Sequence, residues 1–244
     1  MAKIITSVNN EYIKKVAKLK DKKYRDDAKL FIVEGYHLVN EAKKYLTDVL
    51  ITDASDEIDG VNNIIVTDQI IEKLSSVKSP QKIIGICKYF DISEIIGKRF
   101  LILDGVQDPG NLGTLIRCAL GFDIDTVICS KDTVSIYNEK VIRSTQGAIF
   151  HINYYVGDLP MVIEELKRKG VTILSTSLKN SISLNQYDTS NIDSYAIVLG
   201  NEGNGVSKEV QEMADVNLCI EMNSKLESLN VSVAGGILMY MLKK

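Results

Sequence analysis

The sequence of 244 residues has no tryptophan, only three prolines and two histidines, and a net charge of only −3. Its four cysteines form no CxxC pair, so neither a zinc site nor a redox pair is indicated. No apolar run approaches the roughly 20 residues that cross a bilayer, and residues 1–10 lack the pattern of a secretory signal. We therefore expect a cytoplasmic protein with reduced cysteines, no metal and no membrane partner.

The charge that is present is distributed unevenly. Residues 1–30 hold nine Lys or Arg against four Asp or Glu, a local balance of +5 on a chain whose other residues carry −8. A basic segment on a mildly acidic body can steer an anionic partner such as RNA. Lys14, Lys22 and Arg25 are the residues of this segment that we assign to RNA binding. Charge alone favours the alternative, a solvated helix face.

Short apolar runs alternate with helical patterns, which indicates an α/β protein. In the first part of the chain we expect strands at 30–34, 49–52, 63–66 and 83–88, and helices at 36–45, 69–74 and from Ser7, as N-cap, to Leu19. After a linker at 89–98, we expect strands at 100–103, 126–129, 171–175, 196–199 and 216–220, and helices at 111–120, 160–169 and 228–242. This order predicts a mostly parallel sheet covered on both faces.

A polar loop follows the strand at 100–103. Residues 103–117 read LDGVQDPGNLGTLIR, in which Asn111 can cap the next helix and Gly113 permits a close backbone approach. Arg117 lies six residues after Asn111, where its guanidinium could bind a phosphate with two hydrogen bonds. The alternative is a capped helix that carries a surface arginine.

Three glycines follow the strand at 196–199, in the segment AIVLGNEGNGVS. Their order is GxxGxG and not the GxGxxG of dinucleotide-binding proteins, and no GxxxxGK[ST] phosphate loop occurs. Glu202 would repel a pyrophosphate, so this loop suits a ligand without phosphates or one recognised through adenine and ribose. These features argue against the oxidoreductase function that a doubly wound sheet would otherwise allow.

A third loop, IEMNSKLESLNVSVA at residues 220–234, leads from a strand into the last helix. Ser228 is a natural N-cap there, and capping alone could explain it. Glu227, Ser228 and Asn230 lie close together among apolar neighbours, which also suits the wall of a binding site.

Taken together, DGVQDPGNLGTLIR, IVLGNEGNGVS and ESLNVSVA resemble, in this order, the three motifs of the SpoU/TrmH RNA ribose 2′-O-methyltransferases. The resemblance covers residues 99–244, and YNEKVIRSTQGA at 137–148 resembles the family's stretch between the first two motifs. Residues 1–92, with FIVEG at 31–35, resemble the family's substrate-binding domain, which has a ribosomal-protein-like α/β fold.

The resemblance implies a C-terminal α/β domain whose chain forms a deep trefoil knot, a homodimer, and S-adenosylmethionine as the cofactor. It implies methylation of a ribose 2′-hydroxyl in structured RNA, and the N-terminal domain favours rRNA, 23S rRNA in particular. A tRNA 2′-O-methyltransferase remains an alternative. So does a non-catalytic RNA-binding protein that keeps the knot, because Glu221 stands where the family commonly has Pro and Ser224 where it commonly has Gly.

The site residues follow from the same resemblance. Cofactor positions are Leu199, Gly200, Asn201, Gly203, Ile220, Met222 and Leu229, and positions near the reacting centre are Asn111, Arg117, Glu202, Ser228 and Asn230. In the family the residue that matches Arg117 removes the hydroxyl proton. Because arginine is almost always protonated, we also consider that Arg117 holds a phosphate and stabilises negative charge on oxygen. Arg143 is a second candidate for holding a phosphate.

Overall fold

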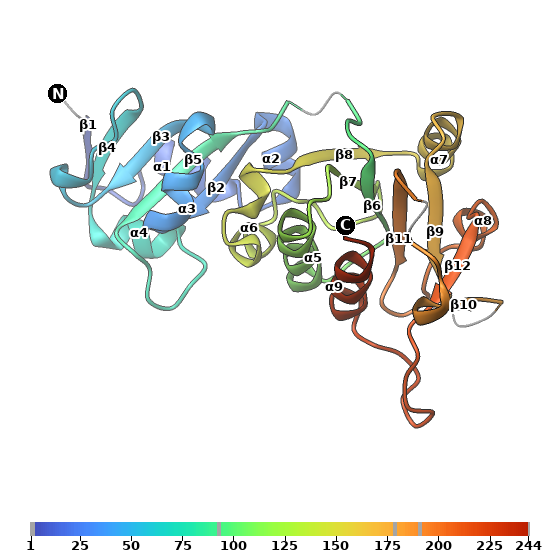
Figure 1. Cartoon of the computed structure of the whole chain (residues 1–244). Coiled ribbons are helices and arrows are strands. Elements are labelled where there is room, and N and C mark those ends of the chain that lie inside the picture. The colour runs from blue at the N-terminus through green and yellow to red at the C-terminus, as the bar shows by residue number, and fades with distance from the viewer. Residues whose placement is uncertain (1–2, 92–93, 178–179, 190–191, 244) are drawn as a thin grey trace. The chain divides into compact units, whose positions relative to one another are not determined.

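The computed structural model describes residues 3–91, 94–177, 180–189 and 192–243 (Figure 1). The chain divides into two compact units, Met1–Asp91 with Ser135–Phe150, and Ile92–Val134 with His151–Lys244. The sequence placed residues 135–150 in the second domain, whereas in the structure they pack within the first unit. Of the linker predicted at 89–98, Ile92 and Ser93 lie outside the described residues.

The first unit is built on a mixed sheet. Its strands are β1 (Lys3–Ile5), β2 (Leu30–Glu34), β3 (Leu46–Ile51), β4 (Asn62–Val66) and β5 (Ile83–Lys88). They lie in the order β1-β4-β3-β5-β2, with β5 antiparallel to both of its neighbours and the other pairs parallel. The predicted strands are confirmed, and β1 was missed because three residues carry no detectable period.

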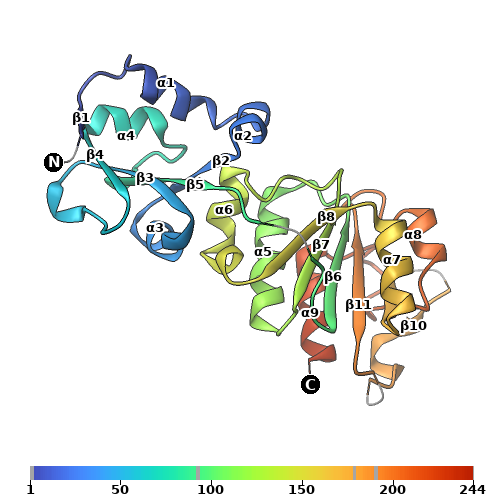
Figure 2. The ribbon, with the colours of Figure 1, turned by 90° about the horizontal axis from the view of Figure 1, so that it is seen from above.

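Short helices cover this sheet. They are α1 (Glu11–Lys18), α2 (Lys22–Ala28), α3 (Tyr36–Glu41), α4 (Asp68–Leu74) and α6 (Glu139–Thr145), with 3₁₀ turns η1 (Lys43–Tyr45), η2 (Ala54–Asp56) and η3 (Ala148–Phe150). Within this unit, Figure 2 shows α1 and α4 on one face of the sheet and α3 on the other. Isoleucines such as Ile13, Ile64 and Ile70 fill the core under α1 and α4.

The predicted start of the first helix is wrong. Asn10 and not Ser7 caps α1, because the Asn10 side-chain oxygen accepts a hydrogen bond from the N–H of Tyr12 at 2.9 Å. The Ser7 hydroxyl instead accepts from the N–H of Asn9, one turn before the helix. The helix α2 was missed because its sequence KKYRDDA is mostly charged and shows no apolar period.

The second unit holds a sheet whose strands pair in parallel throughout. The strands are β6 (Arg99–Asp104), β7 (Thr126–Ser130), β8 (Asn153–Gly157), β9 (Thr172–Thr176), β10 (Ile182–Ser183), β11 (Tyr195–Gly200) and β12 (Val216–Cys219). Their order is β10-β12-β9-β11-β6-β7-β8, so β11 and β6 lie at the centre and are almost entirely buried. The parallel sheet predicted from the alternating pattern is confirmed, while the edge strands β8 and β10 were not predicted.

Helices cover both faces of this sheet (Figure 2), with α5 (Pro109–Gly121) and α9 (Val231–Leu242) on one face and α7 (Leu159–Arg168) and α8 (Lys208–Glu212) on the other. The packing of α9 depends on Gly235. A Cβ there would lie 2.4 Å from a methyl of Leu115 in α5 and 2.7 Å from a methyl of Leu199 in β11. A side chain at this position would therefore push α9 away from α5 and β11.

Two further findings concern the described residues. None of their helices has the length and apolar character needed to cross a bilayer. They also contain no cluster of three or more His, Cys, Asp or Glu side chains that could hold a metal ion.

Candidate active site

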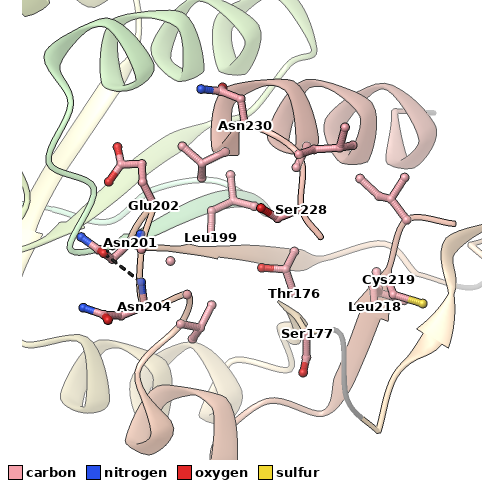
Figure 3. Close-up of a pocket in the computed structure, with 18 of the residues that line it drawn as sticks. Thr176, Ser177, Leu199, Asn201, Glu202, Asn204, Leu218, Cys219, Ser228 and Asn230 are labelled. Atoms are coloured by element: carbon pink, nitrogen blue, oxygen red, sulfur yellow. Dashed lines mark hydrogen bonds between the residues drawn. The ribbon is translucent and has the colours of Figure 1, made fainter. Parts of the chain in front are cut away.

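A cavity of about 570 Å³ opens at the carboxyl ends of the strands in the second unit (Figure 3). Its wall is formed by the segments that follow β9, β11 and β12 and by the start of α9. This is the edge at which open α/β sheets bind ligands, and the volume is typical of a pocket for a small molecule.

The residues assigned to the cofactor all lie on this wall. They are Leu199, Gly200, Asn201, Gly203, Ile220, Met222 and Leu229. Sequence reasoning missed Thr176, Ser177, Gln211 and Cys219, which also line the cavity. Thr176 and Ser177 come at the end of β9, so the rule that ligands bind at carboxyl ends of strands would have found them.

The chemistry of the wall limits what can bind. Among the described residues that line the cavity, Glu202 is the one charged side chain and no Lys or Arg is present. A nucleoside polyphosphate would therefore meet a carboxylate and no cation. The charge of the wall instead favours a ligand that carries positive charge and no phosphate, as S-adenosylmethionine does.

The loop after β11 is shaped by its glycines. Asn201 and Gly205 exchange two backbone hydrogen bonds of 2.9 Å, and the Asn201 side-chain oxygen accepts from the N–H groups of Gly203 and Asn204. A Cβ on Gly200 would lie 2.0 Å from the carbonyl carbon of Gly205. This contact is with backbone, which cannot move aside as a flexible side chain can. The residue at position 200 must therefore be glycine for this loop to close.

Glu202 ties this loop to the start of α5. Its carboxylate accepts hydrogen bonds of 3.1 Å from the backbone N–H of Gln107, from that of Asp108 and from the side-chain amide of Asn111. Burial raises the pKa of Glu202, but these hydrogen bonds outweigh it and hold the pKa below its ordinary value. Glu202 is therefore an anion that positions neighbouring groups.

The third motif joins the same network through Asn230. Its side-chain N–H donates to the Asn111 side-chain oxygen at 2.9 Å, and its own oxygen accepts from the backbone N–H groups of Ser232 and Val233. Each amide thus donates on one side and accepts on the other, so its orientation is determined. The chain of contacts from Glu202 through Asn111 to Asn230, which we name the amide relay, links all three motif segments.

Two cap predictions at this site are wrong, and the corrections explain the relay. Asp108 and not Asn111 caps α5, accepting from the N–H of Asn111 at 2.9 Å. Asn230 and not Ser228 caps α9, which begins three residues after Ser228. Since the Asn111 side chain is not used as a cap, it can bridge Glu202 and Asn230.

The other two residues predicted near the reacting centre, Ser228 and Arg117, are not part of the relay. Ser228 is exposed and lines the cavity. Arg117 is exposed on α5 and is not among the described residues of the cavity wall. It makes no hydrogen bond or ion pair with the described part of the chain, so its guanidinium remains available to a ligand.

The unusual residues of the third motif do not disturb the cavity. Glu221 is exposed and does not line it. Ser224 stands where the family commonly has Gly, yet it is not among the residues with positive φ. A serine therefore adopts this backbone without strain.

The residues assigned to RNA in the first unit differ in accessibility. Lys14 and Lys22 are exposed and form surface ion pairs with Glu11 and Asp26. Arg25, in contrast, is 3% exposed and its guanidinium donates to the carbonyl oxygens of Leu19 and Lys20. A buried guanidinium cannot meet a phosphate from solution, so the prediction that Arg25 binds RNA is wrong.

Arg143 is also engaged within the protein. It lies on α6, with its guanidinium 3.6 Å from the carboxylate of Glu34 and 4.0 Å from that of Glu139. Its charge is thus opposed by two acidic groups before any RNA binds. This position disfavours the phosphate-holding role predicted for it.

Comparison with known proteins agrees with this geometry. The profile of the SpoU rRNA Methylase family matches residues 98–240, and that of the MRM3-like substrate binding domain matches residues 10–85. The 23S rRNA (guanosine(2553)-2′-O)-methyltransferase RlmP of Bacillus subtilis (strain 168) is 36% identical over 248 residues, which cover 99% of each chain.

Solved structures show the same fold. The AdoMet-bound rRNA methyltransferase from Sinorhizobium meliloti superposes with a TM-score of 0.90 at 26% identity, covering 99% of this chain and 97% of that one. The SpoU methyltransferase AviRb from Streptomyces viridochromogenes, at 17% identity, has a TM-score of 0.85 and covers 96% of this chain and 97% of its own. The fold is that of the trefoil-knotted methyltransferases, and the chain belongs to the SpoU rRNA methylase family.

Proposed function

We propose that this chain transfers the methyl group of S-adenosylmethionine to a ribose 2′-hydroxyl of 23S ribosomal RNA. The observation that carries the proposal is the amide relay, which joins three distant motif segments beside a cavity without a basic side chain among its described residues. The relative from Bacillus subtilis, whose name states this activity, matches over 99% of both chains and supports 23S rRNA as the substrate.

The comparisons favour rRNA over tRNA. The A. aeolicus TrmH/SpoU tRNA modifying enzyme covers only 60% of this chain, with a TM-score of 0.54. The Sinorhizobium meliloti rRNA methyltransferase covers 99%. The additional N-terminal unit is therefore shared with a relative that is named for rRNA, and we infer that it helps to select the RNA.

The residues of the chain divide the work of methyl transfer. S-adenosylmethionine, when bound, supplies an electrophilic methyl group on a positively charged sulfur. Glu202 places a negative charge at the cavity and fixes Asn111, while Asn230 fixes the start of α9. The exposed Arg117 can hold an RNA phosphate and stabilise negative charge on the acceptor oxygen.

We infer that RNA docks on α1 and α2. These helices expose a group of lysines that share one sign of charge: Lys14, Lys15, Lys18, Lys22 and Lys23. Tyr24 is 40% exposed between them, with the ammonium of Lys18 5.1 Å from its ring, and such a ring can stack on a base. Replacing Lys18 and Lys23 together with Gln should weaken RNA binding and lower the slope of log K against log salt by about 1–2. An unchanged slope would place the RNA elsewhere.

The homodimer is also part of the proposal. The helix α9 exposes four large apolar side chains at helical spacing, Val233, Ile237, Tyr240 and Met241, with exposed fractions from 36% to 66%. Contiguous apolar side chains of this kind mark an interaction surface in soluble proteins. A second copy of the chain packed on α9 would cover them.

A methyl-transfer assay tests the proposed function. Purified protein is incubated with radiolabelled S-adenosylmethionine and either rRNA or tRNA, and the position of the label is mapped by its resistance to alkali. We expect label at one ribose of 23S rRNA, and a large loss of label with Arg117→Ala. Label in tRNA would establish the alternative substrate, and cofactor binding without label in any RNA would establish a non-catalytic RNA-binding protein.

A further inference from the structure

Residues 135–150 are flanked in the sequence by segments of the second unit, but they pack within the first unit. Tyr137 stacks on Tyr89 with ring centroids 3.6 Å apart, and its hydroxyl accepts a hydrogen bond from the N–H of Phe90 at 3.0 Å. At the other end of the segment, the ring of Phe150 meets that of Phe90 edge-on. Aromatic contacts therefore anchor the segment, which we name the arm, near both of its ends.

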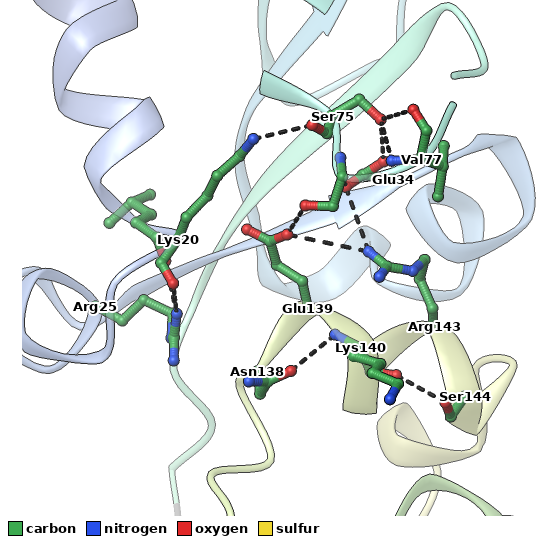
Figure 4. A network of polar contacts seen from close by, with 12 residues as sticks. Lys20, Arg25, Glu34, Ser75, Val77, Asn138, Glu139, Lys140, Arg143 and Ser144 are labelled. Carbon is green, nitrogen blue, oxygen red and sulfur yellow. Dashed lines mark hydrogen bonds and ion pairs between the residues drawn. The ribbon is translucent and has the colours of Figure 1, made fainter. Parts of the chain in front are cut away.

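Charged contacts hold the middle of the arm (Figure 4). Glu34 of β2, whose side chain is 9% exposed, pairs with Arg143 of α6 and accepts hydrogen bonds from the Ser75 hydroxyl at 2.7 Å and the Ser76 N–H at 3.0 Å. Glu139 of α6 accepts from the Ser76 hydroxyl. Because Glu34 is nearly buried, losing Arg143 would leave its charge uncompensated. The arm is thus an integral part of the first unit.

The residues that precede the arm, 130–134, belong to the second unit and bind the loop after β6. The N–H of Val134 donates to the carbonyl oxygen of Val106 at 2.9 Å, and the N–H of Gly105 donates to the Ser130 hydroxyl at 3.0 Å. No residue separates Val134 from the arm, which begins at Ser135. The loop after β6 is therefore hydrogen-bonded to the residues that lead directly into the arm.

Gln107 connects the same loop to the amide relay. Its side-chain amide donates to the carbonyl oxygen of Asp132, and its backbone N–H donates to the carboxylate of Glu202 at 3.1 Å. The next N–H, of Asp108, donates to the other oxygen of that carboxylate. One side chain thus fixes the backbone that orients Glu202, and Glu202 orients Asn111.

We propose that Gln107 is a positioning residue for methyl transfer, and that the arm of the RNA-binding unit holds the relay in place through residues 130–134 and Gln107. This inference rests on the proposed function. The basis for this connection is the chain itself, since Ser135 of the arm directly follows Val134, which is hydrogen-bonded to the loop after β6. It also assigns Arg143 to holding the arm and not to binding phosphate.

Hydrogen–deuterium exchange tests the connection without requiring activity. In the full chain, Gln107→Met keeps the length of the side chain and removes its hydrogen bond. We expect roughly three- to tenfold faster exchange of the amides at 107 and 108, and faster exchange there in Arg143→Met as well. Arg143→Lys, which keeps the charge, should lie between Arg143→Met and the wild type. Unchanged exchange at 107 and 108 in both Arg143 variants, with the arm itself loosened, would overturn the proposal.

Kinetics then separate positioning from folding. Gln107→Met should lower kcat roughly three- to tenfold while the Kd for S-adenosylmethionine and the melting temperature stay as in the wild type. Gln107→Glu should lower kcat further, because its carboxylate would face a carbonyl oxygen and add charge beside Glu202. The matched control is Gln186→Met, since Gln186 is an exposed glutamine of the same unit.

The double variant distinguishes the two roles of Arg143. If Arg143 holds the arm, the double variant Gln107→Met/Arg143→Met has a kcat no lower than that of the less active single variant. Its affinity for RNA is then unchanged. If Arg143 binds phosphate, the KM for RNA rises and the two effects multiply, which would contradict the proposal. Absence of transfer in the wild type would count against the proposed function alone, because the exchange experiment would still report on the arm.

Discussion

Replacing Asn230 with Asp separates the two roles of this side chain. Its oxygen caps α9 by accepting from the N–H of Ser232 at 2.9 Å, and its amide N–H donates to Asn111 in the relay. Aspartate caps a helix as well as asparagine does and adds a favourable charge at the N-terminus of the helix. It cannot donate to Asn111. The substitution therefore keeps the cap and breaks the relay.

The size of the loss follows from the hydrogen bonds. With a carboxylate at 230, either orientation of the Asn111 amide sets two acceptors against each other, at Glu202 or at position 230. An unmade hydrogen bond costs about 1–3 kcal/mol, and this site is exposed, so water recovers part of it. We expect a roughly tenfold loss of kcat, which corresponds to about 1.4 kcal/mol.

Asn230→Ala is the matched variant, because it loses the cap as well. Loss of the cap costs about 1 kcal/mol, which lowers the melting temperature of a chain of this size by about 2–4 °C. The measurements are methyl transfer to rRNA and thermal unfolding for Asn230→Asp, Asn230→Ala and wild type. Wild-type activity in Asn230→Asp, or a melting temperature as low as that of Asn230→Ala, would refute the reasoning.

Three further predictions concern other parts of the second unit. Gly200→Ala should abolish binding of S-adenosylmethionine in a calorimetric titration, because its Cβ would lie 2.0 Å from the backbone of Gly205, whereas Gly121→Ala has open space and should bind as wild type does. The hydrogen bonds of Glu202 lower its pKa in spite of burial, so its stabilising contribution is complete above pH 4.5 and is lost as the pH falls further. The difference in melting temperature between wild type and Glu202→Gln should therefore shrink over that acid range. A constant difference would contradict this prediction. Ile237→Glu, on the exposed face of α9, should convert a dimer into a monomer in light scattering, and an unchanged mass would move the interface elsewhere.

Local pattern predicted most of the elements but not their caps. Each of the three wrong caps lies in a loop with more than one residue that can serve, such as Asp108 and Asn111 before α5 or Ser228 and Asn230 before α9. Which one becomes the cap depends on the direction from which the chain enters the helix. That direction is set by tertiary packing, which the local sequence does not record.

The burial of charged residues was equally hidden from the sequence. Arg25 lies in a basic segment and was assigned to RNA, but the fold turns its guanidinium onto backbone carbonyls. Arg143 lies in a family-like stretch, and the fold brings Glu34 to it across a separation of more than 100 residues. The local sequence is the same whether a charged side chain contacts a distant residue or water.

The sequence by itself determined the alternation of strands and helices, the parallel sheet and the three motif segments, because periodicity and residue chemistry act over a few neighbouring positions. Only the tertiary structure decided that Asn111 meets Glu202 and Asn230, which lie 91 and 119 positions away along the chain. It also decided that residues 135–150 join the first unit. These contacts form where distant segments are brought together by burial of the apolar core, a global property that no short stretch of sequence contains.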